Sequence, residues 1–138
     1  MVKDINHDLE FLAQKAEPAT EDDKQVVVDL LDTLRAHLDG CVGMAANMIG
    51  VNKNIIVFCK GQKQIAMVNP VIVKKLAPYP AEETCLSVPG SKKTIRYNDI
   101  EVVYLDADFK RQRTKFTGFT AQIIQHEIDH TKGILIWW

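Results

Sequence analysis

The chain has 138 residues, enough for one domain of ordinary size. Apolar residues make up 46% and charged residues 25%, proportions that exclude a disordered or fibrous protein and predict a single globular domain over residues 1–138. The formal net charge of −1 gives no basic field, so we expect neither DNA nor an anionic membrane surface as a partner.

The N-terminus turns polar at once and does not build the apolar stretch of a secretory signal, so we expect a cytoplasmic location. Apolar runs such as residues 55–59 are far shorter than the roughly 20 residues needed to cross a bilayer. Three cysteines are an odd number, which argues against a disulfide framework in a reducing compartment. Each cysteine therefore needs another role.

A helix is predicted over residues 20–39. Thr20 can cap its N-terminus, with the carboxylate of Asp23 three residues on. Gly40 stands where a left-handed C-terminal cap would be expected. Five apolar residues recur at helical spacing and form one stripe, which we expect to pack on the core: Val27, Leu30, Leu31, Leu34 and Leu38.

The middle and the end of the chain contain short β-rich runs that we predict to be strands: residues 55–59, 64–68, 71–74, 94–97, 100–105, 111–116 and 134–136. Lys60-Gly61-Gln62 predicts a hairpin between the first two runs. Three other segments are typical of turns or loops: Asn69-Pro70, Pro78-Tyr79-Pro80 and Pro89-Gly90. Trp137-Trp138 are expected to cover the core or to form an exposed apolar patch.

The last predicted helix covers residues 119–131 and ends at Lys132-Gly133. It contains His126, Glu127 and His130, two histidines four apart with a glutamate after the first, which is a metal-binding pattern. Four helical residues turn about 40° beyond one full revolution, so both imidazoles point toward one spot. This spacing indicates that the two histidines can share a metal ion.

Apolar residues flank this helix on both sides. Phe119 and Ile123 share the face of the histidines, whereas Ile124 and Ile128 occupy the opposite face, so we expect the helix to run through a core. Buried imidazoles and carboxylates need partners, and a metal ion satisfies them more completely than packing alone. The alternative, a pair of hydrogen-bonded core histidines, leaves the spacing and the glutamate unexplained.

These elements together predict an α+β fold. Antiparallel β-sheets would pack around a central metal-binding helix, and the amphipathic helix of residues 20–39 would lie N-terminal to them.

A third metal ligand is required, because a catalytic metal normally has three protein ligands and one open position. No His, Asp, Glu or Cys follows His130, so we expect the ligand upstream, and a thiolate is the best candidate. Cys85 lies in a polar, irregular segment where side chains and backbone N–H groups can converge. Cys59 ends a β-run and is expected to pack as a small apolar residue, and Cys41 follows Gly40. Position favours Cys85 and leaves the other two cysteines open.

Three short segments match the motifs of a known family. Residues 41–48 read Cys-Val-Gly-Met-Ala-Ala-Asn-Met, residues 83–87 read Glu-Thr-Cys-Leu-Ser, and residues 125–130 read Gln-His-Glu-Ile-Asp-His. In the same order they resemble the Gly-x-Gly-x-Ala-Ala-x-Gln, Glu-Gly-Cys-Leu-Ser and Gln-His-Glu-x-Asp-His segments of the peptide deformylases. These are iron or zinc enzymes that remove the N-formyl group from new bacterial polypeptides. With lesser matches between the segments, the similarity covers nearly the whole chain.

The resemblance implies a metal-dependent hydrolase that removes the formyl group from the N-terminal methionine of nascent polypeptides through metal-bound hydroxide. Cys85, His126 and His130 would bind the metal. Glu127 would be the general base that takes a proton from metal-bound water and later delivers it to the leaving amine. The backbone N–H of Leu86 would face the oxyanion that forms at the formyl group.

The resemblance also implies substrate contacts. Val42 and Gly43 would offer backbone hydrogen bonds to an extended peptide, and Phe119 and Ile123 would line the pocket for a methionine side chain. The implied partner is a formylated peptide N-terminus, with the translating ribosome as a further candidate.

One divalent metal ion is the implied cofactor. A Cys-His-His ligand set suits Fe²⁺, Zn²⁺, Ni²⁺ or Co²⁺, and the family resemblance favours Fe²⁺. Glu83 and Arg96 would pair and brace the segment that carries Cys85.

Three residues depart from the family's motifs. Met48 stands where the family has a glutamine whose amide acts with the Leu86 N–H as the second oxyanion donor, and a thioether cannot donate a hydrogen bond. Cys41 and Thr84 replace glycines and add bulk near the metal. One alternative is therefore a deformylase-like binding or regulatory protein with weak or lost activity. Another is hydrolysis of a different small acyl amide by the same mechanism.

Overall fold

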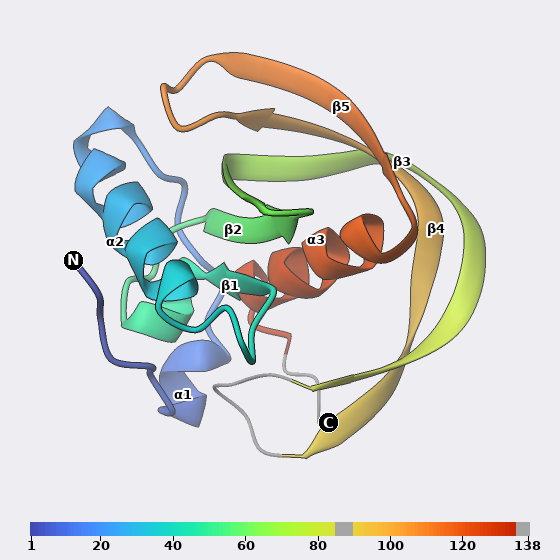
Figure 1. Cartoon of the computed structure of the whole chain (residues 1–138), viewed down its shortest axis with the longest axis horizontal. Coiled ribbons are helices and arrows are strands. Elements are labelled where there is room, and N and C mark those ends of the chain that lie inside the picture. Colours follow the sequence, from blue (N-terminus) through green and yellow to red (C-terminus); the bar gives the residue numbers. More distant parts are fainter. Residues whose placement is uncertain (85–89, 135–138) are drawn as a thin grey trace.

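The computed structural model of the chain describes residues 1–84 and 90–134. The fold class is α+β, as predicted: a curved antiparallel sheet carries α2 on one face and α3 on the other (Figure 1). Among the described residues, no helix has the length and apolar character needed to cross a membrane.

The helices are α1 (Leu9–Leu12), α2 (Lys24–Arg35) and α3 (Gly118–Thr131), with two 3₁₀ helices, η1 (Glu21–Asp23) and η2 (Ala46–Ile49). The strands are β1 (Gly43–Ala45), β2 (Ile55–Lys60), β3 (Lys63–Thr84), β4 (Ser91–Leu105) and β5 (Arg111–Thr117). The strands lie in the order β1-β2-β3-β4-β5, and every neighbouring pair is antiparallel.

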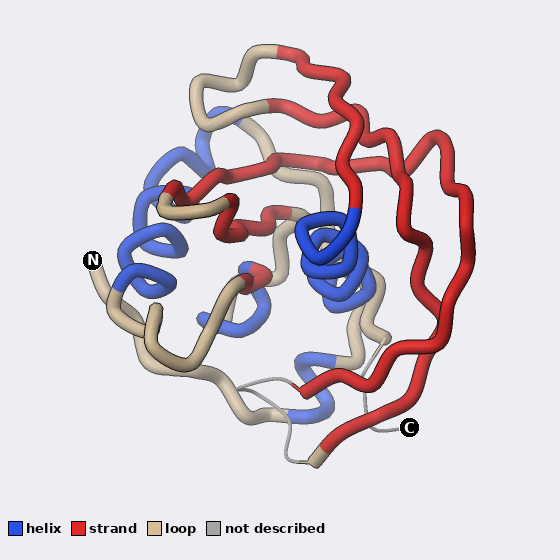
Figure 2. The backbone as a smooth tube through the Cα atoms, turned by 45° about the vertical axis from the view of Figure 1, so that its right-hand side comes forward, coloured by secondary structure: helices blue, strands red, loops and turns tan. Residues whose placement is uncertain are grey.

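Alternate residues of β2 face two separate cores, because successive side chains of a strand point to opposite faces. Ile55 and Val57 pack in a core with α2, whereas Ile56 and Phe58 pack in a second core with α3. The sheet bends around α3 (Figure 2), so the helix is central, as predicted. The described strands form one sheet rather than several, because β3 and β4 are long enough to curve around the helix.

The helix predicted over residues 20–39 is shorter than expected. Thr20 and Asp23 form the predicted capping box, but they cap the 3₁₀ turn η1, and the α-helix α2 ends at Arg35. Leu34 is buried, whereas Leu38 is exposed. Packing on the core therefore does not stabilise the helix as far as Leu38. Gly40 is not left-handed, which makes the expected C-terminal cap there wrong.

Asn69-Pro70 bends a strand instead of ending it. The predicted strands at residues 64–68 and 71–74 are both parts of β3, and the pairing with β4 shifts register between Val68 and Val71. Asn69 has a positive φ of 52°, and its side-chain amide bonds to both main-chain polar groups of Ala19, at 2.8 and 2.9 Å. This local pairing stabilises a bulge where a turn was expected.

Pro78-Tyr79-Pro80 also lies inside β3, so the predicted turn there is wrong. Pro78 pairs with Tyr97 and Pro80 with Ile95 of β4, which likewise merges the strands predicted at residues 94–97 and 100–105. Strand β2 pairs with β3 only as far as Val68, so no strand of the described residues pairs with the other, open edge of this part of β3. Prolines two residues apart direct their missing N–H groups to the same side, and an open edge tolerates them.

Two other local predictions are confirmed. Lys60 pairs with Lys63 across a two-residue turn in which Gly61 adopts a left-handed φ of 61°. The strand predicted at residues 111–116 is β5, which pairs with β4 along its whole length.

Helix α3 starts one residue before the predicted position and ends at Thr131, as predicted. Its C-terminal Gly133 is left-handed, with φ of 77°, and a Cβ there would lie 2.3 Å from the carbonyl oxygen of Ala13. Only glycine fits that close approach. Ile134 is not in a strand; the rest of the strand predicted at residues 134–136, and Trp137-Trp138, lie outside the described residues.

Candidate active site

The metal-binding pattern of α3 is buried in the core, as predicted. His126, Glu127 and His130 are at most 7% exposed, and one ligand atom from each lies within 4.8 Å of the others. The two Nε2 atoms of His126 and His130 are 3.2 Å apart. Two nitrogens bound at about 2.0–2.1 Å to one tetrahedral metal ion would lie about 3.3–3.4 Å apart. These three residues thus form a group that could hold a divalent metal ion.

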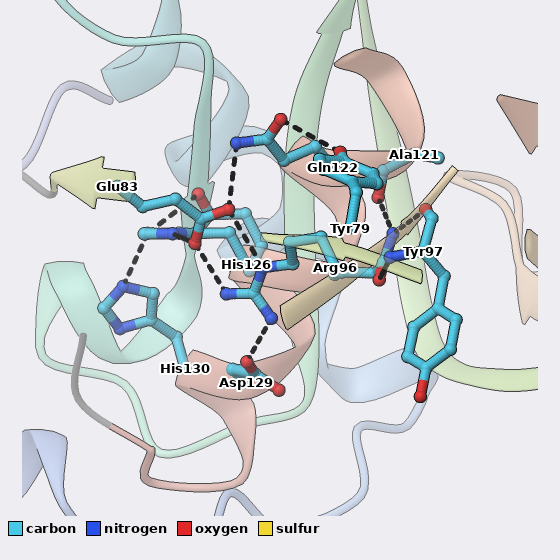
Figure 3. Close-up of polar contacts among 11 residues, drawn as sticks. Tyr79, Glu83, Arg96, Tyr97, Ala121, Gln122, His126, Asp129 and His130 are labelled. Carbon is cyan, nitrogen blue, oxygen red and sulfur yellow. Dashed lines mark hydrogen bonds and ion pairs between the residues drawn. The ribbon is translucent and has the colours of Figure 1, made fainter. Parts of the chain in front are cut away.

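Glu83, at the end of β3, fixes the orientation of His126 (Figure 3). His126 Nδ1 lies 2.9 Å from Oε1 of Glu83. A carboxylate accepts hydrogen bonds, so Nδ1 carries the proton and Nε2 keeps its lone pair for a metal ion. Gln122, one turn earlier on α3, donates to the other oxygen of Glu83 at 3.1 Å, and Tyr79 donates to Gln122.

Arg96 of β4 completes the set of groups around Glu83. Its guanidinium donates to both oxygens of Glu83, at 2.9 and 2.6 Å, and to Asp129 of α3. Burial opposes ionisation of Glu83, but the hydrogen bonds from His126 and Arg96 outweigh it and lower its pKa to about 2. The pair expected between Glu83 and Arg96 is therefore present, and Asp129 ties it to the helix that carries the histidines.

Glu127 lies on the other side of His126 and has a different environment. Its Oε2 is 4.0 Å from His126 Nε2, and its Oε1 is buried without a hydrogen-bond partner among the described residues. Burial raises the pKa of Glu127 to about 7, because among the described residues no donor to Oε1 compensates the lost hydration of the carboxylate. Such a carboxyl can accept or release a proton near neutral pH.

His130 is also buried from solvent. Burial lowers the pKa of His130 to about 3, so its imidazole is neutral and can donate a lone pair to a metal ion. Its Nδ1 also has no partner among the described residues. Unpartnered buried polar atoms are costly in a protein interior, so Oε1 of Glu127 is available to a further group bound at this site.

A cavity of about 310 Å³ opens beside these residues, and β1 forms part of its wall. Gly43 of β1 comes so close to α3 that a Cβ at this position would lie 2.7 Å from Ile123 and 3.0 Å from Oε2 of Glu127. Glycine is therefore required for β1 to reach the carboxylate. The cavity is lined by Gly40, Cys41, Val42, Gly43, Met48, Glu82, Glu83, Thr84, Phe119, Gln122, Ile123, His126 and Glu127.

The four residues predicted to bind substrate all line this cavity. Phe119 is 63% and Val42 41% exposed, whereas Ile123 and Gly43 are buried. The carbonyl oxygen of Val42 accepts a hydrogen bond from the Cys59 N–H at 2.8 Å, so this carbonyl faces β2. The backbone contacts from Val42 and Gly43 to a peptide stay a prediction.

The three residues that depart from the family's motifs also line the cavity. Met48 is buried, and its sulfur accepts a hydrogen bond from the Ala45 N–H at 3.4 Å. Cys41 and Thr84 are at the cavity wall as well. Cys85 and Leu86, predicted as third ligand and oxyanion donor, lie outside the described residues.

Sequence reasoning missed two residues that hold the site together. Gln122 precedes His126 by four residues and so lies on the same face of α3, a spacing that could have indicated its contact with Glu83. Gln125 pairs its side-chain amide with the main-chain N–H and C=O of Tyr97, both at 2.8 Å, and thereby fixes α3 against β4. Its place beside His126 in the motif was visible, but its partner is remote in the sequence.

Comparison with known proteins agrees with this geometry. A family model described as "Polypeptide deformylase" matches residues 2–137. The peptide deformylase of Clostridium beijerinckii is 57% identical over 136 residues, which cover 99% of this chain and 100% of that protein. A peptide deformylase structure from Legionella pneumophila has a TM-score of 0.87 at 33% identity, over 99% of this chain and 84% of that chain. A class I type b peptide deformylase from Acinetobacter baumannii with bound Met-Ala-Ser has a TM-score of 0.88 at 28% identity, over 99% and 97% of the two chains. This chain belongs to the peptide deformylase family.

Proposed function

We propose that this chain is a metal-dependent peptide deformylase that removes the N-formyl group from the N-terminal methionine of nascent polypeptides. The observation that carries the proposal is the grouping of His126, Glu127 and His130 beside an open cavity, in a chain that matches the family over residues 2–137. We take residues 1–138 as one domain that performs this reaction.

The metal ion would be held by His126, His130 and Cys85. A bound divalent metal acts as a Lewis acid and makes water reactive at neutral pH. Glu83 supports this role, because it holds the proton on His126 Nδ1 and leaves Nε2 available. Two imidazoles and a thiolate suit several first-row metals, and family membership favours Fe²⁺ over Zn²⁺, Ni²⁺ and Co²⁺.

Glu127 is the proton carrier of this proposal. It accepts a proton from the water that attacks the formyl carbon, and it returns that proton to the amine nitrogen as the C–N bond breaks, which releases formate and a free N-terminus. With no metal bound, burial raises its pKa to about 7, so the carboxyl is able both to take up and to release a proton. The N–H of Leu86 would stabilise the oxyanion at the formyl group.

The peptide would bind along β1. Strand β1 pairs with β2 on one side, and no described strand pairs with its other, open edge at Gly43, next to Glu127. An extended peptide can add to such an edge by main-chain hydrogen bonds. The side chains of Val42, Phe119 and Ile123 would then contact the methionine side chain in the cavity.

A direct test measures metal content and hydrolysis of a formyl-Met peptide under anaerobic conditions, with one defined metal at a time, because Fe²⁺ and a thiolate ligand both oxidise in air. We expect turnover that requires metal and that is lost in the Glu127→Ala variant. Bound metal without turnover on any formylated peptide would contradict the proposal.

One observation favours a second candidate, a deformylase-like protein with weak activity. The buried Met48 lines the cavity and its sulfur can only accept a hydrogen bond, as it does from Ala45. A site with one oxyanion donor fewer would turn over slowly. Formyl, acetyl and free peptides compared in one assay separate slow deformylation from hydrolysis of a different acyl amide.

We also propose that the protein works in the cytoplasm, where it meets new chains at the translating ribosome. Cosedimentation with ribosomes that carry formylated nascent chains tests this, with vacant ribosomes as the control.

A further inference from the structure

The main-chain N–H and C=O groups of Gly43 point away from the neighbouring strand β2. The register pairs Gly43 with Phe58 of β2, and the adjacent pair, Val42 and Cys59, is joined by a hydrogen bond from the Cys59 N–H to the Val42 carbonyl. In an antiparallel ladder, hydrogen-bonded and non-hydrogen-bonded pairs alternate. The N–H and C=O of Gly43 therefore face the open edge of β1 and not β2.

That carbonyl already has a hydrogen-bond partner in the free chain. The Cys41 thiol, two residues earlier, lies 3.0 Å from the Gly43 carbonyl oxygen and donates to it. Cys41 is half-buried, and it lines the same cavity as Gly43 and Glu127. The thiol thus bonds to an acceptor of the residue that packs against the Glu127 carboxylate.

We propose that Cys41 sets the affinity for the substrate, because its thiol competes with the peptide main chain for the Gly43 carbonyl. The inference rests on the proposed function. A peptide that adds to β1 brings an N–H donor to this oxygen, and the thiol has to rotate away or share the acceptor. A glycine at position 41, as in the family's motif, has no donor to displace.

Displacing the Cys41 thiol weakens substrate binding and does not slow the chemical step, because the thiol leaves the Gly43 carbonyl before the reaction begins. Uniform binding effects of this kind change KM with kcat constant. A net hydrogen bond is worth a few-fold in affinity, and a thiol is a weak donor. We therefore expect Cys41→Ala to lower KM by about two- to five-fold.

The experiment compares four proteins loaded with the same metal: wild type, Cys41→Ala, Cys41→Ser and Cys59→Ala. Cys41→Ser keeps a donor of similar reach and should have a KM equal to or above that of wild type. Cys59→Ala removes another half-buried thiol, on β2, and should leave both constants unchanged. Equal KM for wild type and Cys41→Ala would overturn the inference, and so would an equal drop in the alanine and serine variants.

Binding of the unformylated peptide Met-Ala-Ser, measured by calorimetry, gives a second reading that does not depend on turnover. The same order of affinities is expected, with Cys41→Ala the tightest. Absence of turnover in wild type with every metal would contradict the proposed function. Turnover and peptide binding that do not respond to Cys41→Ala would contradict only the role of Cys41.

Discussion

Two buried carboxylates flank His126, and their environments are opposite. Glu83 is 7% and Glu127 4% exposed, so burial alone would raise both pKa values. Glu83 accepts hydrogen bonds from His126, Arg96 and Gln122, and its pKa falls to about 2. Glu127 has an oxygen without a partner among the described residues, and its pKa rises to about 7.

The hydrogen-bond donors around Glu83 distinguish it from Glu127, because they offset the effect of burial. Glu83 is locked as an anion and can only orient His126. Glu127 changes its protonation state near neutral pH and is suited to carry a proton.

The largest effect is expected from Glu127→Gln, which removes the proton carrier and keeps the shape. We expect kcat of the metal-loaded protein to fall by about 10²–10⁴. Because Glu127 Oε1 has no partner in the described part of the chain, the melting temperature should not fall. Retained activity would mean that another group carries the proton.

The second prediction concerns Met48→Gln, which adds a hydrogen-bond donor to the cavity wall. In Met48→Gln, the amide oxygen can replace the sulfur as acceptor for the Ala45 N–H, and the amide nitrogen can donate toward the cavity. We expect kcat/KM to rise by about 10²–10³, the usual contribution of one oxyanion donor. Met48→Leu is the shape-matched control, and equal activities of the two variants would contradict the prediction.

Glu83→Gln tests whether the ionised Glu83 carboxylate orients His126. An amide presents N–H groups to donors that need an acceptor, so His126 loses its fixed orientation and Arg96 keeps only Asp129 as an ionic partner. We expect the metal affinity to fall by about 10- to 100-fold, measured by competition with a chelator. Glu82→Gln, one residue earlier and exposed, is the control. Unchanged affinity in Glu83→Gln would show that His126 is oriented by other contacts.

The sequence alone predicted how the site residues on helix α3 are arranged. The spacing of His126, Glu127 and His130 is fixed by helical geometry, so their convergence followed from the pattern alone. The partner of His126 comes from the end of β3, and its approach depends on the curvature of β3 and β4 around α3. No local pattern contains that curvature, and only the family resemblance indicated that Glu83 and Arg96 would pair.

The turns wrongly predicted within β3 have the same physical origin. Pro78 and Pro80 are turn signals in isolation, but an open strand edge tolerates them, and an edge is a property of the whole sheet. Asn69 was assigned to a turn because its partner, the backbone of Ala19, is remote in the sequence. The cavity-lining role of Gly43 was implied by the motif, whereas its contact with Glu127 depends on tertiary packing.

The smallest predicted effect is the pH dependence of stability in the metal-free protein. The pKa of Glu83 is lowered from 4.5 to about 2, so its contribution is present above about pH 4.5 and is lost as the pH falls toward 2. The pKa of Glu127 is raised from 4.5 to about 7, so stability is lost as the pH rises from about 4.5 to 7.

Denaturant unfolding of wild type and the two glutamine variants separates these opposite trends. The stability advantage of wild type over Glu83→Gln should shrink below about pH 4.5, and wild type should lose stability relative to Glu127→Gln between about pH 4.5 and 7. Each slope is at most about 1.4 kcal/mol per pH unit. If both differences moved in the same direction with pH, the two carboxylates would share one environment, and donors would not be what distinguishes Glu83 from Glu127.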